Sequence, residues 1–122
     1  MSGRTPDTPT TTSSKDHLAE SLPLSIDLVT ELAGMFQLMA DPSRLRIILE
    51  CLHTPVSVSD IARRLCLSSS LVSHHLRLLR AARLIQSERH GTRIFYHITD
   101  EHIRRTLSDM TQHVREDDEP AE

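Results

Sequence analysis

Near the C-terminus, four residues carry side chains of the types that bind transition metals: Asp100, His102, His113 and Glu116. Two imidazole nitrogens and two carboxylates suit a tetrahedral zinc or cobalt(II) ion. The histidines are 113 − 102 = 11 residues apart, which corresponds to about 16 Å along one helix. Because a zinc–nitrogen bond is only about 2 Å long, no single ion can bind both histidines of one chain.

A second copy of the same helix, antiparallel to the first and crossing it near residue 108, removes this difficulty. It would bring His113 and Glu116 of one chain beside Asp100 and His102 of the other, and two-fold symmetry would make two identical sites. A dimer seam for this pairing exists at spacings of 4, 3 and 4: Ile103, Leu107, Met110 and Val114. The alternative is that these four residues pack on the chain's own core while the histidines and acids are solvated.

A second group of side chains indicates a DNA-binding surface. Residues 61–99 carry seven arginines against one glutamate, a net charge of 7 − 1 = +6 in a chain whose total is −3. Polar residues at helical spacing within this block form one face suited to base edges and phosphates in the major groove. The alternative is an ordinary solvated helix face. The residues predicted to contact DNA are Ser69, Ser70, Ser73, His74, Arg77, Arg80, Arg89 and Arg93.

The helices that would position these residues follow from apolar periodicity and capping signals. The predicted helices span residues 24–39, 42–52, 57–65, 69–82 and 101–115. Their predicted N-caps, from the second helix onward, are Asp41, Ser57, Ser68 and Asp100. The helices 57–65 and 69–82 are joined by a short turn, which is typical of a helix-turn-helix.

After these helices the pattern changes to period two. Segments 84–89 and 93–99 predict two strands around a turn at 90–92, where Gly91 can take a positive φ. The predicted fold is therefore mainly α with a β-hairpin wing, a winged helix-turn-helix that forms a homodimer. The expected domains are a disordered N-terminal arm (1–20), a DNA-binding and dimerisation domain (21–116) and an acidic tail (117–122).

Composition restricts the class of protein. No apolar run approaches the roughly 18–20 residues that a membrane span needs, and the segment from Met1 to Asp16 does not resemble a signal peptide. These features predict a cytoplasmic protein whose Cys51 and Cys66 stay reduced. One tyrosine and two phenylalanines are too few for an aromatic platform that stacks single-stranded nucleic acid.

Three segments together resemble the ArsR/SmtB family of metal-sensing bacterial repressors: 38–47 (LMADPSRLRI), 71–80 (LVSHHLRLLR) and 91–96 (GTRIFY). The resemblance covers roughly residues 26–116. It implies a winged-helix homodimer that binds double-stranded operator DNA with inverted-repeat symmetry and releases it when metal binds. Zinc and cobalt sensors of this family carry Asp-x-His and His-x-x-Glu on the last helix, which Asp100–His102 and His113–Glu116 match.

Other sites and functions are less consistent with the sequence. The family's Cys-Val-Cys site for soft metals is replaced by Ser57-Val58-Ser59, and hydroxyls bind soft metals poorly. An enzyme is not expected, because four protein ligands would close the metal shell and no H-E-x-x-H motif is present. Two alternatives remain: a repressor that senses thiol oxidation through Cys51 and Cys66, or a nickel sensor that recruits extra ligands from the N-terminal arm.

Overall fold

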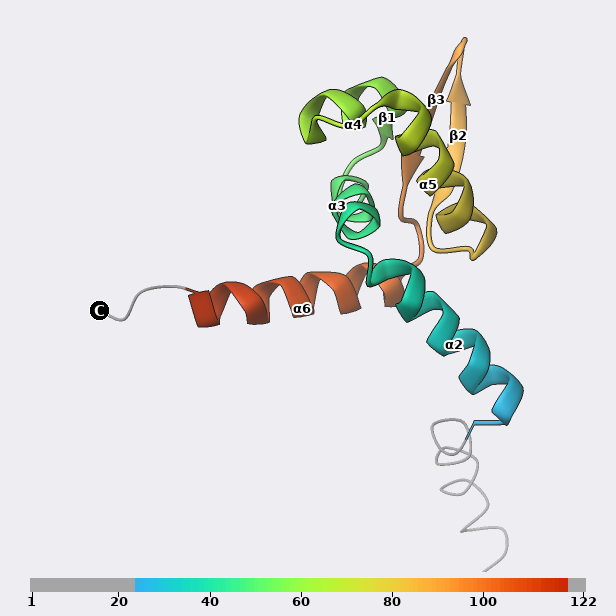
Figure 1. Cartoon of the computed structure of the whole chain (residues 1–122), viewed down its shortest axis with the longest axis vertical. Coiled ribbons are helices and arrows are strands. Elements are labelled where there is room, and N and C mark those ends of the chain that lie inside the picture. The colour runs from blue at the N-terminus through green and yellow to red at the C-terminus, as the bar shows by residue number, and fades with distance from the viewer. Residues whose placement is uncertain (1–23, 119–122) are drawn as a thin grey trace, which may run out of the picture. The chain divides into compact units, whose positions relative to one another are not determined.

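A computed structural model describes residues 24–118, which fall into two compact units that divide between Gly34 and Met35. The elements in chain order are α2 (Ile26–Met39), α3 (Pro42–Glu50), β1 (Val56–Ser57), α4 (Val58–Leu65), α5 (Ser69–Ala81), β2 (Gln86–His90), β3 (Arg93–His97) and α6 (Glu101–Asp118) (Figure 1). The mainly helical fold with a β-hairpin is confirmed. The predicted arm, residues 1–20, lies outside the described residues.

The described part of the first unit is the beginning of α2. Its apolar side chains Ile26, Leu28, Val29 and Leu32 are exposed. No helix within residues 24–118 is both long enough and apolar enough to cross a membrane.

The helices of the second unit begin at the predicted N-caps. Asp41 Oδ2 accepts a hydrogen bond from the Arg44 backbone N–H (3.0 Å), and Pro42 occupies the first turn, where a missing N–H costs nothing. Ser57 Oγ accepts from the N–H of Asp60 (3.2 Å), and Ser68 Oγ accepts from the N–H of Leu71 (3.1 Å). Each such cap contributes about 1 kcal/mol, so short polar residues define where α3, α4 and α5 start.

The turn between α4 and α5 is closed by Cys66, which adopts the left-handed conformation (φ 58°) that glycine usually supplies. Its backbone N–H points back to the carbonyls of Ala62 and Arg63, so α4 ends there without a glycine. Two helices joined by this turn form the predicted helix-turn-helix.

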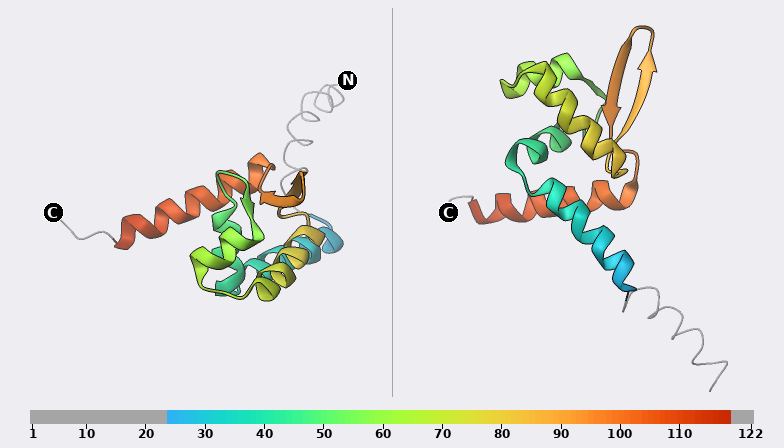
Figure 2. Two further views of the ribbon diagram at one scale, coloured as in Figure 1. Left: turned by 90° about the horizontal axis from the view of Figure 1, so that it is seen from above. Right: turned by 45° about the vertical axis from the view of Figure 1, so that its right-hand side comes forward.

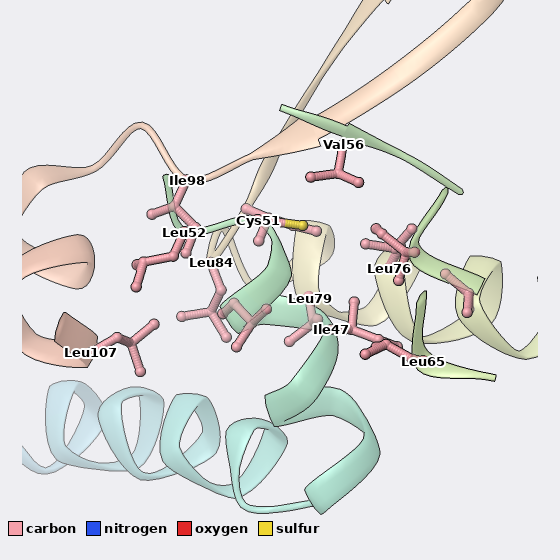
Figure 3. Close-up of a cluster of buried hydrophobic side chains, with 14 of the residues drawn as sticks. Ile47, Cys51, Leu52, Val56, Leu65, Leu76, Leu79, Leu84, Ile98 and Leu107 are labelled. Atoms are coloured by element: carbon pink, nitrogen blue, oxygen red, sulfur yellow. The ribbon is translucent and has the colours of Figure 1, made fainter. Parts of the chain in front are cut away.

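One hydrophobic core joins α3, α4, α5 and the start of α6 (Figure 3). Its fully buried side chains come from every one of these helices except α6, which contributes Leu107 at 7% exposure. The segments before and after the hairpin add to the same core. Its largest buried members are Ile47, Ile48, Ile61, Leu76, Leu79, Leu84, Ile85, Ile98, Val72 and Cys51.

The sheet has three strands in the order β1–β3–β2, all antiparallel. The strand β1 was not predicted. It pairs Val56 with Tyr96 and Ser57 with Phe95, and Val56 is 3% exposed. Two residues, the second of which is the N-cap of α4, are too few to show an alternating pattern, so sequence periodicity could not reveal this strand.

The predicted start of the hairpin at residue 84 is wrong, because β2 begins at Gln86. Leu84 and Ile85 are both 1% exposed, which alternation in a half-buried strand would not allow. Arg83 has φ 63°, and the Leu84 N–H donates to the Leu79 carbonyl (2.9 Å). These two apolar residues therefore lie in the connection between α5 and β2, where both are part of the core.

The hairpin turn is shorter than expected. His90 pairs with Arg93 inside the ladder, so the turn consists of Gly91 and Thr92. Gly91 has the predicted positive φ, 65°. The strand β3 ends at His97, two residues before its predicted end at 99, because the backbone N–H groups of residues 98 and 99 bond outside the ladder.

Two helix ends also differ from the prediction. The helix α3 ends at Glu50, and Cys51 is its C-cap, so the predicted end at 52 is wrong. The helix α6 continues to Asp118, beyond the predicted end at 115. Asp117 and Asp118, expected in the acidic tail, are therefore helical, while residues 119–122 lie outside the described part of the chain.

The one buried titratable side chain on α5 is His75, which is 8% exposed. Burial, which penalises the charged imidazolium, is the main cause that lowers the pKa of His75. The positive charge of Arg44 and the neighbouring His74 lower it further, while Asp41 acts in the opposite direction. The fold therefore favours the neutral form of His75.

This burial predicts acid sensitivity of the fold. Because the pKa of His75 is lower in the folded than in the unfolded state, the unfolded chain takes up the proton first as pH falls. The stabilisation is complete above about pH 6.5, the ordinary histidine value, and is lost as pH falls toward the lowered folded pKa. His75→Gln should flatten this part of the pH profile of the free energy of unfolding, measured by urea denaturation. The matched control is His53→Gln, which changes an exposed histidine outside this cluster; equal profiles for wild type and His75→Gln would contradict the assignment.

Candidate metal and DNA-binding sites

The predicted metal ligands lie at the two ends of α6, and all four side chains are exposed. Asp100 and His102 stand at the first turn, and His113 and Glu116 at the last turns (Figure 1). Within residues 24–118 of one chain, no three His, Cys, Asp or Glu side chains are grouped closely enough to hold a metal ion. A single chain thus presents two separated pairs, and metal binding by these residues stays a prediction.

The donor atoms fit a zinc ion as far as one chain can show. Asp100 caps α6 through Oδ1, which accepts from the Ile103 N–H (3.0 Å), so its second carboxylate oxygen is left for another partner. The Nε2 atom of His113 lies 3.8 Å from Asp117 Oδ2, a distance that leaves the ring available. Exposed imidazoles and carboxylates can reach an ion shared with another molecule, which buried ones could not.

The four residues of the predicted dimer seam lie in two different environments. Leu107 is buried and Ile103 is half-buried, and both pack against the chain's own core. Met110 and Val114 are 56% and 64% exposed. The second half of α6 extends away from the other helices of its unit, as the two views in Figure 2 show. The exposed apolar surface on α6 is therefore narrower than the four-residue seam.

The helix α5 separates its two faces as expected. Val72, Leu76 and Leu79 are fully buried. The predicted DNA-contacting residues of α5 are exposed apart from one half-buried serine, and they are Ser69, Ser70, Ser73, His74, Arg77 and Arg80. The neighbouring His75 is buried on the opposite, inward face.

The two wing arginines differ in their surroundings. Arg89 is exposed and has no hydrogen bond or ion pair within residues 24–118. Arg93 donates to Ser57 Oγ (2.9 Å), lies 4.0 Å from Asp60 Oδ2, and places its guanidinium over the Phe95 ring (5.1 Å). Arg93 therefore ties the hairpin to the start of α4, and Arg89 is the freer cation at the tip.

The single acidic residue of the hairpin is held between two histidines. Glu88 Oε2 lies 2.8 Å from His90 Nε2, and Glu88 Oε1 lies 3.0 Å from His97 Nε2. Alternation places these three residues on the same face of the hairpin as Arg93 and Phe95. These two contacts of Glu88 were not predicted, because Glu88 entered the sequence argument only as the negative charge among the arginines of residues 61–99.

The two cysteines lie in different environments. Cys51 is fully buried, and burial raises the pKa of its thiol to about 12, so the reactive thiolate is suppressed. Cys66 is exposed at the turn of the helix-turn-helix, whereas the sequence suggested an ordinary buried thiol. A thiol-sensing pair would need both sulfurs to be reactive, which the burial of Cys51 opposes.

Comparisons with known proteins agree with this architecture. A family model described as a bacterial regulatory protein of the arsR family matches residues 41–87. A transcriptional repressor SmtB homolog from Synechocystis is 35% identical over 95 residues, which are 78% of this chain and 72% of that protein. The transcriptional regulator NmtR from Mycobacterium tuberculosis is 34% identical over 93 residues, 76% of this chain and 78% of that protein.

Solved structures show the same fold. A homodimeric winged helix-turn-helix DNA-binding domain from Mycobacterium bovis, a possible ArsR-family regulator, is similar with a TM-score of 0.67 at 24% identity. The similarity covers 78% of this chain and 90% of that one. This similarity shows that the helix-turn-helix followed by a hairpin has the winged-helix fold.

The chain belongs to the ArsR/SmtB family of metal-sensing winged-helix transcriptional repressors. The resemblance inferred from its motifs is confirmed. The relatives are transcriptional regulators rather than enzymes, in agreement with the expectation that this chain is not an enzyme.

The thiol environments predict a split reactivity. Cys66 should react with a thiol reagent in the native protein, while Cys51 should react only after unfolding, because its pKa of about 12 leaves almost no thiolate near neutral pH. A titration with and without denaturant checks this, with Cys66→Ser as the control that abolishes the native reaction. Rapid native modification of Cys51, or a disulfide between the two under mild peroxide, would restore the thiol-sensing alternative.

Proposed function

We propose that this protein is a metal-responsive repressor that binds operator DNA as a homodimer and releases it when zinc or cobalt(II) binds. Each of two identical sites takes Asp100 and His102 from one chain and His113 and Glu116 from the other. The protein acts on DNA in the cytoplasm. Nickel, with further ligands from residues 1–20, is the second candidate effector.

One observation supports the proposal: the ligand pairs are exposed at opposite ends of α6, and the same helix carries exposed apolar residues. Met110 and Val114 have no partner in the core. An antiparallel copy of α6 would cover them and would also bring complementary ligand pairs together. Burial of apolar surface and completion of the metal site therefore favour the same arrangement.

The DNA-binding part of the proposal uses the exposed face of α5. Arg77 and Arg80 point away from the core on the helix that follows the helix-turn-helix turn, where a recognition helix enters the major groove. Arg89 would contact the backbone or the minor groove from the wing. A two-fold dimer recognises an inverted repeat with half-sites about one helical turn apart, or a multiple of it.

The sign of the response, release of DNA, is what the family resemblance implies, because subunit geometry alone would allow either sign. Metal ions that join the start of one α6 to the end of the other fix the relative orientation of the subunits. A small rotation moves both recognition helices out of register with successive grooves. By linkage, operator DNA must weaken zinc binding by the same factor. Since His102 and His113 must be neutral to bind metal, acid should weaken the response.

Removal of one ligand tests the metal site. His113→Ala should bind operator DNA like wild type without metal but should no longer be released by zinc, measured by fluorescence anisotropy. His53→Ala, which changes an exposed histidine elsewhere, should be released normally.

Tighter operator binding in zinc by the wild type would make the metal a corepressor and would contradict the proposal. Cobalt(II) should give intense visible bands of tetrahedral geometry. Weak octahedral bands that depend on residues 1–20 would instead support nickel.

The recognition face is tested with Arg77→Ala. The loss of operator affinity should be about 1–3 kcal/mol if Arg77 reads a base, or the salt slope should fall by about one if it contacts phosphate. Arg105→Ala, on α6, is the matched control and should change neither quantity. An Arg77→Ala protein with unchanged affinity and unchanged salt slope would remove this residue from the DNA interface.

A further inference from the structure

Residues 98–100 connect β3 to α6, and we call this segment the joint. It contains the proposed ligand Asp100 and ends two residues before the proposed ligand His102. Ile98 is buried, and its N–H donates to the Cys51 carbonyl (3.1 Å). Its own carbonyl accepts from Arg104 Nη2 (2.8 Å). The side chain of Asp100 caps α6. Ile98 is thus bonded to the C-cap of α3 and to α6, and Asp100 is bonded to α6.

The bond partner of the middle residue is a side chain of the wing. Gln86 Oε1 accepts both from the Thr99 backbone N–H (2.8 Å) and from Thr99 Oγ1 (2.6 Å). Gln86 is the first residue of β2 and pairs with His97 of β3. One amide oxygen therefore connects the base of the wing to the residue that precedes Asp100.

We propose that Gln86 is a positioning residue that couples the start of α6 to the wing, so that metal binding at Asp100 and His102 reorients the wing. The inference rests on the proposed metal-responsive function and extends it. It assigns part of the signal to a route within one subunit, in addition to rotation between subunits. A ligand that moves Asp100 must move the adjacent Thr99, and Thr99 is bonded to β2 on both of its donors.

The side-chain nature of this contact separates coupling from folding. Thr99 is exposed, so water can replace the amide oxygen if Gln86 is changed, and the free energy of unfolding should change little. With water in place of the Gln86 amide oxygen, α6 can still bind metal. The bond that would make the wing move with Thr99 is then absent. The other connection, from Ile98 to α3, is made by backbone groups and is retained in any side-chain variant.

The experiment measures operator affinity with and without zinc in Gln86→Met, which keeps the length of the side chain and removes the acceptor. The ratio of the two affinities should fall about fivefold or more below the wild-type ratio, a change within the range of typical couplings. Affinity without zinc should stay within about twofold of wild type. In the zinc-free protein, the Thr99 amide should exchange its hydrogen faster, which reports the loss of the bond independently of any metal.

Two further variants complete the test. Gln86→Glu keeps an acceptor oxygen and should retain the wild-type ratio. Thr99→Val loses the hydroxyl donor but keeps the N–H, should lower the ratio by less than Gln86→Met, and replaces that variant if it does not fold. A wild-type ratio in both Gln86→Met and Thr99→Val overturns the inference while leaving the proposed function intact. A wild type that does not respond to zinc overturns both.

Discussion

The separation of two histidines along one helix limits how this protein can bind a metal ion. His102 and His113 lie at the first and last turns of α6, too far apart for a shared ion. A site that needs both therefore needs two chains, and the two-fold axis must pass near the middle of α6. Met110 is exposed in this region, so the surface that such pairing requires is present. In the proposed function, the same requirement lets metal control the spacing of two DNA-binding surfaces.

In the proposed function, the metal signal reaches DNA because the first half of α6 packs on the same core as α5, the proposed recognition helix. Leu107 lies in the same core as Leu76 and Leu79 of α5 (Figure 3), so the first half of α6 and the recognition helix form one body. The wing is attached through the β1–β3 ladder and through two side-chain contacts, Gln86 to Thr99 and Arg93 to Ser57 at the start of α4. In our proposal, the shared core lets α5 respond to metal together with α6, and the Gln86 contact adds a second route to the wing.

Local signals predicted most of this fold, and long-range packing accounts for what they missed. The caps at Asp41 and Ser68 were predictable because a side chain and a backbone N–H three residues away interact within one segment. The strand β1 was not predictable, because Val56 is in a strand only through its pairing with β3. Leu107 and Arg93 were placed on functional surfaces by spacing alone, whereas tertiary contacts bury the first and anchor the second. The two proposed ligand pairs, Asp100 with His102 and His113 with Glu116, could be recognised because each pair lies within one short segment. The proposed contact between the two pairs requires a second chain.

Mixed dimers of two variants show whether each metal site is shared between two chains. His102→Ala and His113→Ala each break both sites of their own homodimer, so neither protein alone should bind zinc tightly. After the two are unfolded and refolded together, a heterodimer joins the intact Asp100 and His102 of one variant to the intact His113 and Glu116 of the other. Zinc titration of the purified heterodimer should then show a single restored tight site. A heterodimer that binds no zinc, or homodimers that keep full zinc binding, would contradict the account.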